Sequence, residues 1–286
     1  MPGRDAWQRA RRPQPVPFHS GRRRWQASGA MLRGMRLAGR TCGTSATWLN
    51  RQTQNFAAPR PFRRSSPRNS CSGARRRSRQ PPQLRFRFAD LGPEAIGPRG
   101  TLAQTYLRSR ALELPDEAAN AAIRFHPACR FGNERMPAMV CLVRNIRTDE
   151  PQAIHRTALS PDGTAVKRNS KTFRMTLDPI ADGAVKLDLD EDVTQGVCIA
   201  EGVETALAGR QMGLRPVWAL LGESGLASFP VLPGVDGLHI FREHDATNKR
   251  AAMACAGRWH EAGRDVFHVC PEIGSDLNDE LLEATK

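Results

Sequence analysis

Three acidic residues follow two short apolar segments in the second half of the chain. Glu201 comes directly after Gly196–Ala200 (GVCIA), and Glu243 and Asp245 follow Gly237–Arg242 (GLHIFR). Carboxylates that gather in one crevice repel each other and therefore need a cation. Their hard oxygen ligands select Mg²⁺ or Mn²⁺, which keep several waters and bridge to phosphate groups. The three acids therefore indicate metal-dependent chemistry on a phosphate.

The residues next to these acids suit such a site. Gly202 follows Glu201, where a glycine allows a sharp turn and the close approach of a phosphate. Side chains two apart on an extended chain share a face, so we expect Glu243 and Asp245 to project together while His244 points away.

Alternating strands and helices are expected to position the acids. Continuous apolar strands that alternate with amphipathic helices predict a parallel sheet covered on both faces. Ligands of such sheets lie beyond the carboxyl ends of the strands, which is where the acids stand. The predicted strands are Gly196–Ala200, Pro216–Leu221, Gly237–Arg242 and Asp265–Cys270, and the predicted helices are Val203–Gly213, Thr247–Gly263 and Asp276–Ala284.

A different pattern precedes this region. Thr101–Ala111 is expected to form a helix, and Pro137–Arg144, Gln152–Leu159 and Lys167–Met175 a small antiparallel meander. The predicted fold class is α/β: a parallel sheet with flanking helices, preceded by a small mixed α+β subdomain and a disordered basic N-terminal arm. The predicted boundaries are 1–95 for the arm, 98–192 for the subdomain and 193–286 for the α/β domain.

The N-terminal arm carries most of the positive charge. Residues 1–100 contain 22 Arg, no Lys and three acids, a net charge of +19, whereas the whole chain of 286 residues has +14. Residues 1–90 show no regular spacing of apolar residues. They cannot bury enough apolar surface to offset the entropy lost on ordering, so they are expected to be disordered. Three roles stay open: a solvated tail, an arm that binds nucleic-acid phosphates, or an organelle transit peptide.

Composition excludes several classes of protein. No apolar run approaches the roughly 20 residues of a membrane helix, and no secretory signal begins the chain. The seven cysteines are scattered and form no CxxC pair, which argues against a zinc ribbon and a disulfide scaffold. We therefore expect a cytoplasmic protein without a membrane partner.

Glu201-Gly202 after a short strand, followed by an acid-x-Asp at Glu243–Asp245, resembles the Toprim domain. This domain is shared by bacterial-type primases, type IA and II topoisomerases, and some nucleases and recombination proteins. The longer strings that look like the Toprim proteins of phage and plasmid primases are Gln195–Ala208 (QGVCIAEGVETALA), Pro216–Leu220 (PVWAL), Glu243–Ala252 (EHDATNKRAA), Arg258–Asp265 (RWHEAGRD) and Asp276–Leu281 (DLNDEL).

The segment before this region resembles the subdomain that precedes Toprim in those primases. The resemblance covers residues 98–286 in all and stops at the basic arm. The strings that carry its upstream part are Gly100–Leu107 (GTLAQTYL), Ile123–Pro127 (IRFHP), Pro137–Val140 (PAMV) and Ile154–Leu159 (IHRTAL).

The resemblance implies a metal-dependent nucleotidyl transfer that makes short primers on a DNA template from nucleoside triphosphates. Glu201 would act as general acid or base, and Glu243 and Asp245 would hold Mg²⁺ or Mn²⁺. Gly202, Glu204, Asp276 and Asp279 are expected to lie next to these residues and to support them without holding the metal directly. The chain departs from the family because Glu243 stands where the first Asp of Asp-x-Asp is usual, and because it has neither a zinc-binding module nor a P-loop.

Basic residues of the upstream segment are candidates for binding nucleic acid or nucleotide. Arg156 lies on a predicted strand next to a turn and is a candidate for a phosphate contact. Lys167, Arg168, Lys171 and Arg174 form a basic run that would line a template or nucleotide groove, or else be a solvated face. A replicative helicase is a further expected partner. Two other functions stay open: a Toprim nuclease, and a mobile-element remnant that binds nucleic acid without catalysis.

Overall fold

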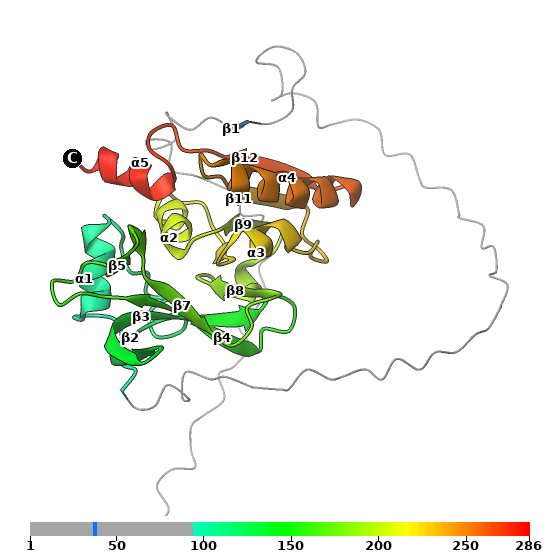
Figure 1. Cartoon of the computed structure of the whole chain (residues 1–286). Coiled ribbons are helices and arrows are strands. Elements are labelled where there is room, and N and C mark those ends of the chain that lie inside the picture. Colours follow the sequence, from blue (N-terminus) through cyan, green and yellow to red (C-terminus); the bar gives the residue numbers. More distant parts are fainter. Residues whose placement is uncertain (1–36, 39–93) are drawn as a thin grey trace, which may run out of the picture.

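The computed structural model describes residues 37–38 and 94–286, and Figure 1 shows how their helices and strands are arranged. The expected disordered arm, residues 1–95, lies outside the described residues except for residues 37–38 and 94–95. No helix within the described residues is long and apolar enough to cross a membrane.

The C-terminal part of the chain alternates strands with helices, as predicted. Each of the four strands pairs in parallel with at least one other, because β11 lies between β9 and β12 and β10 lies on the other side of β9. The strands are β9 (Gly196–Ala200), β10 (Val217–Ala219), β11 (Gly237–Phe241) and β12 (Asp265–Val269). The helices are α2 (Val203–Gln211), α3 (Glu223–Ser228), α4 (Ala246–Glu261) and α5 (Leu277–Ala284).

The upstream part is antiparallel. Its helix is α1 (Leu102–Ser109), and its sheet strands are β2 (Ile123–Phe131), β3 (Glu134–Asn145), β4 (Pro151–Ala158), β7 (Arg174–Leu177) and β8 (Gly183–Lys186). The short elements are β1 (Leu37–Ala38), a hairpin of β5 (Lys167–Arg168) and β6 (Lys171–Thr172), and a 3₁₀ turn, η2 (Asp190–Asp192).

Both parts contribute to a single mixed sheet of ten strands in the described residues. Its order is β1-β12-β11-β9-β10-β8-β3-β4-β7, with β2 paired to β3. β8 joins the two parts, because it pairs antiparallel with β10 on one side and with β3 on the other. The expected fold class, an α/β sheet with flanking helices after a mixed segment, is confirmed (Figure 1).

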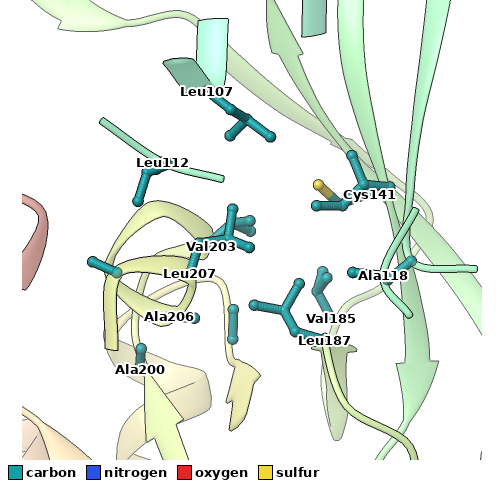
Figure 2. Close-up of a cluster of buried hydrophobic side chains, with 14 of the residues drawn as sticks. Leu107, Leu112, Ala118, Cys141, Val185, Leu187, Ala200, Val203, Ala206 and Leu207 are labelled. Carbon is teal, nitrogen blue, oxygen red and sulfur yellow. The ribbon is translucent and has the colours of Figure 1, made fainter. Parts of the chain in front are cut away.

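Alternate side chains of β9 enter two different cores, as the period of a strand requires. Val197 and Ile199 pack in a cluster with residues of α3 and α4. Cys198 and Ala200 face a second cluster, which contains side chains from α1, α2 and β3. Figure 2 shows this second cluster, in which Leu107 of α1 and Leu207 of α2 converge. This shared core holds the upstream segment against the parallel part.

The predicted single strand over Lys167–Met175 is wrong. The chain forms the β5–β6 hairpin there and continues into β7. Asn169 and Ser170, the two residues of the hairpin turn, both have positive φ, 49° and 63°. A two-residue turn of this kind matches the twist of the strands that flank it, so it folds the segment back on itself.

Besides the short β1 and η2, three elements were missing from the prediction. β2 contains Pro127, which cannot donate a ladder hydrogen bond and hides a strand from pattern reading, and its register shifts between His126 and Cys129. β8 has four residues and α3 six, so neither is long enough to show a period.

Candidate active site

A cavity of about 260 Å³ lies where the chain leaves β9 and β11. Four acids line it, namely Glu201, Glu204, Glu243 and Asp276, and so do the cations Arg110 and Arg174. The acids belong to the parallel part of the chain, whereas Arg110 caps the end of α1 and Arg174 begins β7. The cavity therefore brings carboxylates of one part together with guanidinium groups of the other.

Glu201 follows β9 and is fixed at two points. Its backbone carbonyl accepts a hydrogen bond from the amide of Leu221 at 2.8 Å, and its Oε2 accepts one from Nδ2 of Asn248 at 3.0 Å. Gly202, the next residue, is the N-cap of α2 and has extended backbone angles, so the turn itself does not require a glycine. A Cβ atom there would make only ordinary van der Waals contacts, with the side chains of Thr205 and Glu204. Because Gly202 lines the cavity, its lack of a side chain leaves that space open.

Glu243 lies two residues beyond the end of β11. Its amide donates to Oδ1 of Asn248 at 3.0 Å, and Thr205 donates to its Oε1 at 3.4 Å. Burial and the negative charges of Glu201, Asp276 and Asp245 raise its pKa from 4.5 to about 7. Burial is the largest cause of this shift, and the neighbouring carboxylates add to it.

Asp245 is exposed and is the N-cap of α4. Its Oδ1 accepts both capping bonds, from the amides of Thr247 and Asn248 at 2.8 Å each. The premise that Glu243 and Asp245 project together from an extended strand is wrong, because β11 ends at Phe241 and the chain turns into the helix. Glu243 faces the cavity, whereas Asp245 is not among the residues that line it.

Asp276 and Asp279 begin the last helix. Asp276 is the N-cap of α5, accepts bonds from the amides of Asn278 and Asp279, and lines the cavity. Asp279 accepts bonds from the amide and hydroxyl of Ser275, at 3.0 and 2.5 Å, and so fixes the turn before the helix. Of these two candidates, the structure therefore brings Asp276 to the other acids.

Comparison with known proteins bears on both parts of the chain. Residues 196–286 match the family described as the Toprim domain, and residues 81–187 match a domain of unknown function (DUF7146). Residues 196–286 are a Toprim domain. The Toprim resemblance inferred from the sequence is thereby confirmed. No match is found among curated proteins.

Several solved primase structures are similar to the chain. The primase fragment of the bacteriophage T7 primase-helicase protein is 13% identical, with a TM-score of 0.46, over 63% of this chain and 69% of that one. A DNA primase domain from Pseudomonas aeruginosa is 16% identical, with a TM-score of 0.44, over 65% and 68%. The Aquifex aeolicus primase is 14% identical, with a TM-score of 0.46, over 65% and 55%. These likenesses carry no information on activity or substrate.

Glu204 of the Toprim domain is buried in an ion pair across the two parts of the chain. Its Oε1 accepts hydrogen bonds from the hydroxyl of Tyr106 and from Nη2 of Arg174, both at 2.7 Å. Burial acts to raise the pKa of Glu204, but the charge and hydrogen bond of Arg174 and the bond from Tyr106 outweigh it and lower the pKa to about 2. The sequence placed Glu204 near the site but gave no sign of its partners, which lie on α1 and β7.

His155 of β4 also lines the cavity. Burial lowers its pKa from 6.5 to about 4, so the imidazole is neutral at pH 7. A neutral ring is consistent with its position close to Arg174, whose charge disfavours a second cation.

The basic candidates occupy three kinds of position. Arg156 is buried and its guanidinium donates to the backbone carbonyls of Arg130 and Thr176. It also lies over the ring of Phe131, so these contacts stabilise the sheet. Lys167 is exposed and lines a second cavity, of about 650 Å³, together with Arg110. Two further basic residues are on the same hairpin: Arg168, which pairs with Glu134 and lies over Phe173, and Lys171, which is exposed.

Toprim domains depend on divalent metals, and the donor set of this cavity suits one. Within residues 94–286 no three side chains of His, Cys, Asp or Glu are gathered as a metal site. Glu201, Glu243 and Asp276 nevertheless line one cavity, and the negative charges of Glu201 and Asp276 are among the causes that raise the pKa of Glu243. Hard carboxylate oxygens with space for water are the ligands that Mg²⁺ prefers. These residues therefore fit a divalent cation.

Proposed function

We propose that the chain catalyses Mg²⁺-dependent nucleotidyl transfer on DNA and makes short primers during replication of a mobile element. The observation that carries this proposal is the cavity of the Toprim domain, where Glu201, Glu243 and Asp276 face Arg110 and Arg174. A polyphosphate is the ligand class that needs both a metal held by carboxylates and fixed cations.

In this proposal Glu243, with Asp245 and Asp276, would hold Mg²⁺. When bound, the ion neutralises charge on the triphosphate. Asp245 has both capping bonds on Oδ1, so its Oδ2 is the oxygen it could offer.

The proposed reaction joins a 3′-hydroxyl to the α-phosphorus of a nucleoside triphosphate. The new bond forms between the 3′-oxygen and phosphorus, the bond from phosphorus to the bridging oxygen breaks, and pyrophosphate leaves. Glu201 accepts the hydroxyl proton, and its hydrogen bond from Asn248 keeps the carboxylate aimed. Arg110 and Arg174, which line the same cavity, would contact the negative charge of the triphosphate, Arg174 while it keeps its bond to Glu204.

We further propose that residues 98–192 form the part that guides a DNA template and that residues 193–286 form the part that reacts. The second cavity supports this division, since Arg110 lines both cavities and Lys167 and several hydroxyl side chains surround the second. Cations and hydroxyls together are typical contacts to a phosphate backbone. A replicative helicase as partner remains a prediction.

Primer synthesis by the full chain tests the proposal. Labelled nucleoside triphosphates and a single-stranded DNA template are incubated with Mg²⁺ and, separately, with EDTA, and cleavage of the same DNA is followed in parallel. We expect Mg²⁺-dependent oligonucleotides that Glu201→Gln reduces by about 10²-fold or more. Glu223→Gln, a matched change in the first turn of α3 outside the cavity, should keep the activity.

Other outcomes of this assay would replace the proposal. Cleavage without synthesis would show a Toprim nuclease, and neither product, with DNA binding retained, would show a binding protein without catalysis.

A further inference from the structure

Asn248 lies in the first turn of α4 and has no exposed surface. A buried carboxamide must satisfy two donors and an acceptor, so its contacts are specific. We propose that Asn248 is a positioning residue that sets the spacing of the carboxylates in the Toprim cavity. This inference rests on the proposed function, because it concerns the same carboxylates.

The side chain of Asn248 joins the ends of two neighbouring strands. Nδ2 donates to Oε2 of Glu201 at 3.0 Å, just after β9, and Oδ1 accepts from the amide of Glu243 at 3.0 Å, after β11. The amide of Asn248 donates to Oδ1 of Asp245 at 2.8 Å. One residue therefore contacts all three acids identified from the sequence.

The two bonds fix which way the carboxamide points. The amide of Glu243 can only donate, so it must meet the oxygen of Asn248, and the carboxylate of Glu201 can only accept while ionised, so it must meet the nitrogen. An aspartate would offer no donor to Glu201, and an alanine would offer neither group. Asparagine can therefore form a hydrogen bond to each of these two residues from this position.

The two hydrogen bonds of Asn248 are needed to hold Glu201 and Glu243 near each other because their carboxylates repel one another. The charge of Glu201 is one of the causes that raise the pKa of Glu243. A neutral group bonded to both restrains them without adding charge, and the bond from Nδ2 favours the ionised form of Glu201. Partners of this kind, which orient ligands without touching the metal, are typically worth 10- to 100-fold in metal affinity.

Mn²⁺ binding to the full-length protein tests this role without requiring turnover. Mn²⁺ affinity is measured at pH 7 by calorimetry and by the EPR signal of free Mn²⁺ for the wild type, Asn248→Asp and Asn248→Ala. Asn248→Asp keeps the shape and the acceptor for Glu243, loses the donor to Glu201 and adds a negative charge, whereas Asn248→Ala loses both bonds without adding charge. The matched control is Asn145→Asp, the same change at the last residue of β3, where the Asn145 side chain accepts bonds from two backbone amides.

We expect Asn248→Ala, which loses both bonds, and Asn248→Asp, which loses the donor to Glu201, each to bind Mn²⁺ about tenfold or more weakly than the wild type. Asn145→Asp should bind like the wild type.

Unchanged affinity in both Asn248 variants, with a wild type that binds Mn²⁺, would overturn the positioning role and leave the metal site standing. A wild type that binds no Mn²⁺ would overturn the proposed metal site itself. The two failures are therefore distinguishable.

Discussion

Removing the charge of Glu204 should destabilise the protein in a pH-dependent way. Its pKa is lowered from 4.5 to about 2 in the folded protein, and a shift of this size corresponds to about 3 kcal/mol of folding free energy at neutral pH. Because the folded pKa is the lower one, this stability is present above pH 4.5 and is lost as the pH falls towards 2. Glu204→Gln keeps the shape of the side chain and removes the charge.

We expect Glu204→Gln to lower the free energy of unfolding by up to about 3 kcal/mol at pH 7. The exposed fraction of the Arg174 side chain, 39%, lets water compensate part of the lost pairing, so the measured value should fall below this figure. Near pH 2.5 the difference from the wild type should largely vanish. Urea unfolding followed by tryptophan fluorescence, to which the buried Trp218 and Trp259 contribute, measures both values.

The control for this experiment is Glu283→Gln, in the last turn of α5, where the side chain is 46% exposed and the same substitution should have little effect. A loss below about 0.5 kcal/mol at pH 7 in Glu204→Gln, or the same loss at pH 2.5, would refute the reasoning.

Three further predictions concern the site and its surroundings. Because the pKa of Glu243 is raised to about 7, Mg²⁺ affinity should increase from pH 6 to pH 8 with release of a proton, which calorimetry in two buffers of different ionisation enthalpy detects. Lys167→Ala should weaken binding of single-stranded DNA and reduce the slope of log affinity against log salt by about one, whereas Lys286→Ala should leave the slope unchanged. Deleting residues 1–90 should flatten the salt dependence further and leave the remaining chain folded; an unchanged slope would show that the arm does not touch DNA.

The elements of the Toprim domain could be predicted because each carries its own pattern. β9 is a continuous apolar run that ends at Glu201, and the predicted range, Gly196–Ala200, agrees with the structure. β2 could not be predicted in the same way, since Pro127 and two arginines interrupt its pattern and its pairing with β3 depends on a distant segment. Local patterns predict local structure, but they do not show which partner completes a strand.

The acids of the candidate site could be identified from their places after strands, whereas the groups that hold them could not. Glu204 lies 98 residues from Tyr106 and 30 from Arg174, and no local pattern links the three. Asn248 lies in a predicted helix, and an asparagine in a helix is usually interpreted from sequence as a surface residue. Its contacts exist only because β9 and β11 are neighbours and α4 starts beside both.

The most direct test of the central claim is a crystal structure of the full chain soaked with Mn²⁺, with anomalous scattering used to locate the ion. The account predicts an anomalous peak in the cavity, within coordination distance of Glu243 and at least one other carboxylate among Glu201, Asp245 and Asp276. A cavity without a peak at saturating Mn²⁺, with these side chains turned away from one another, would contradict it.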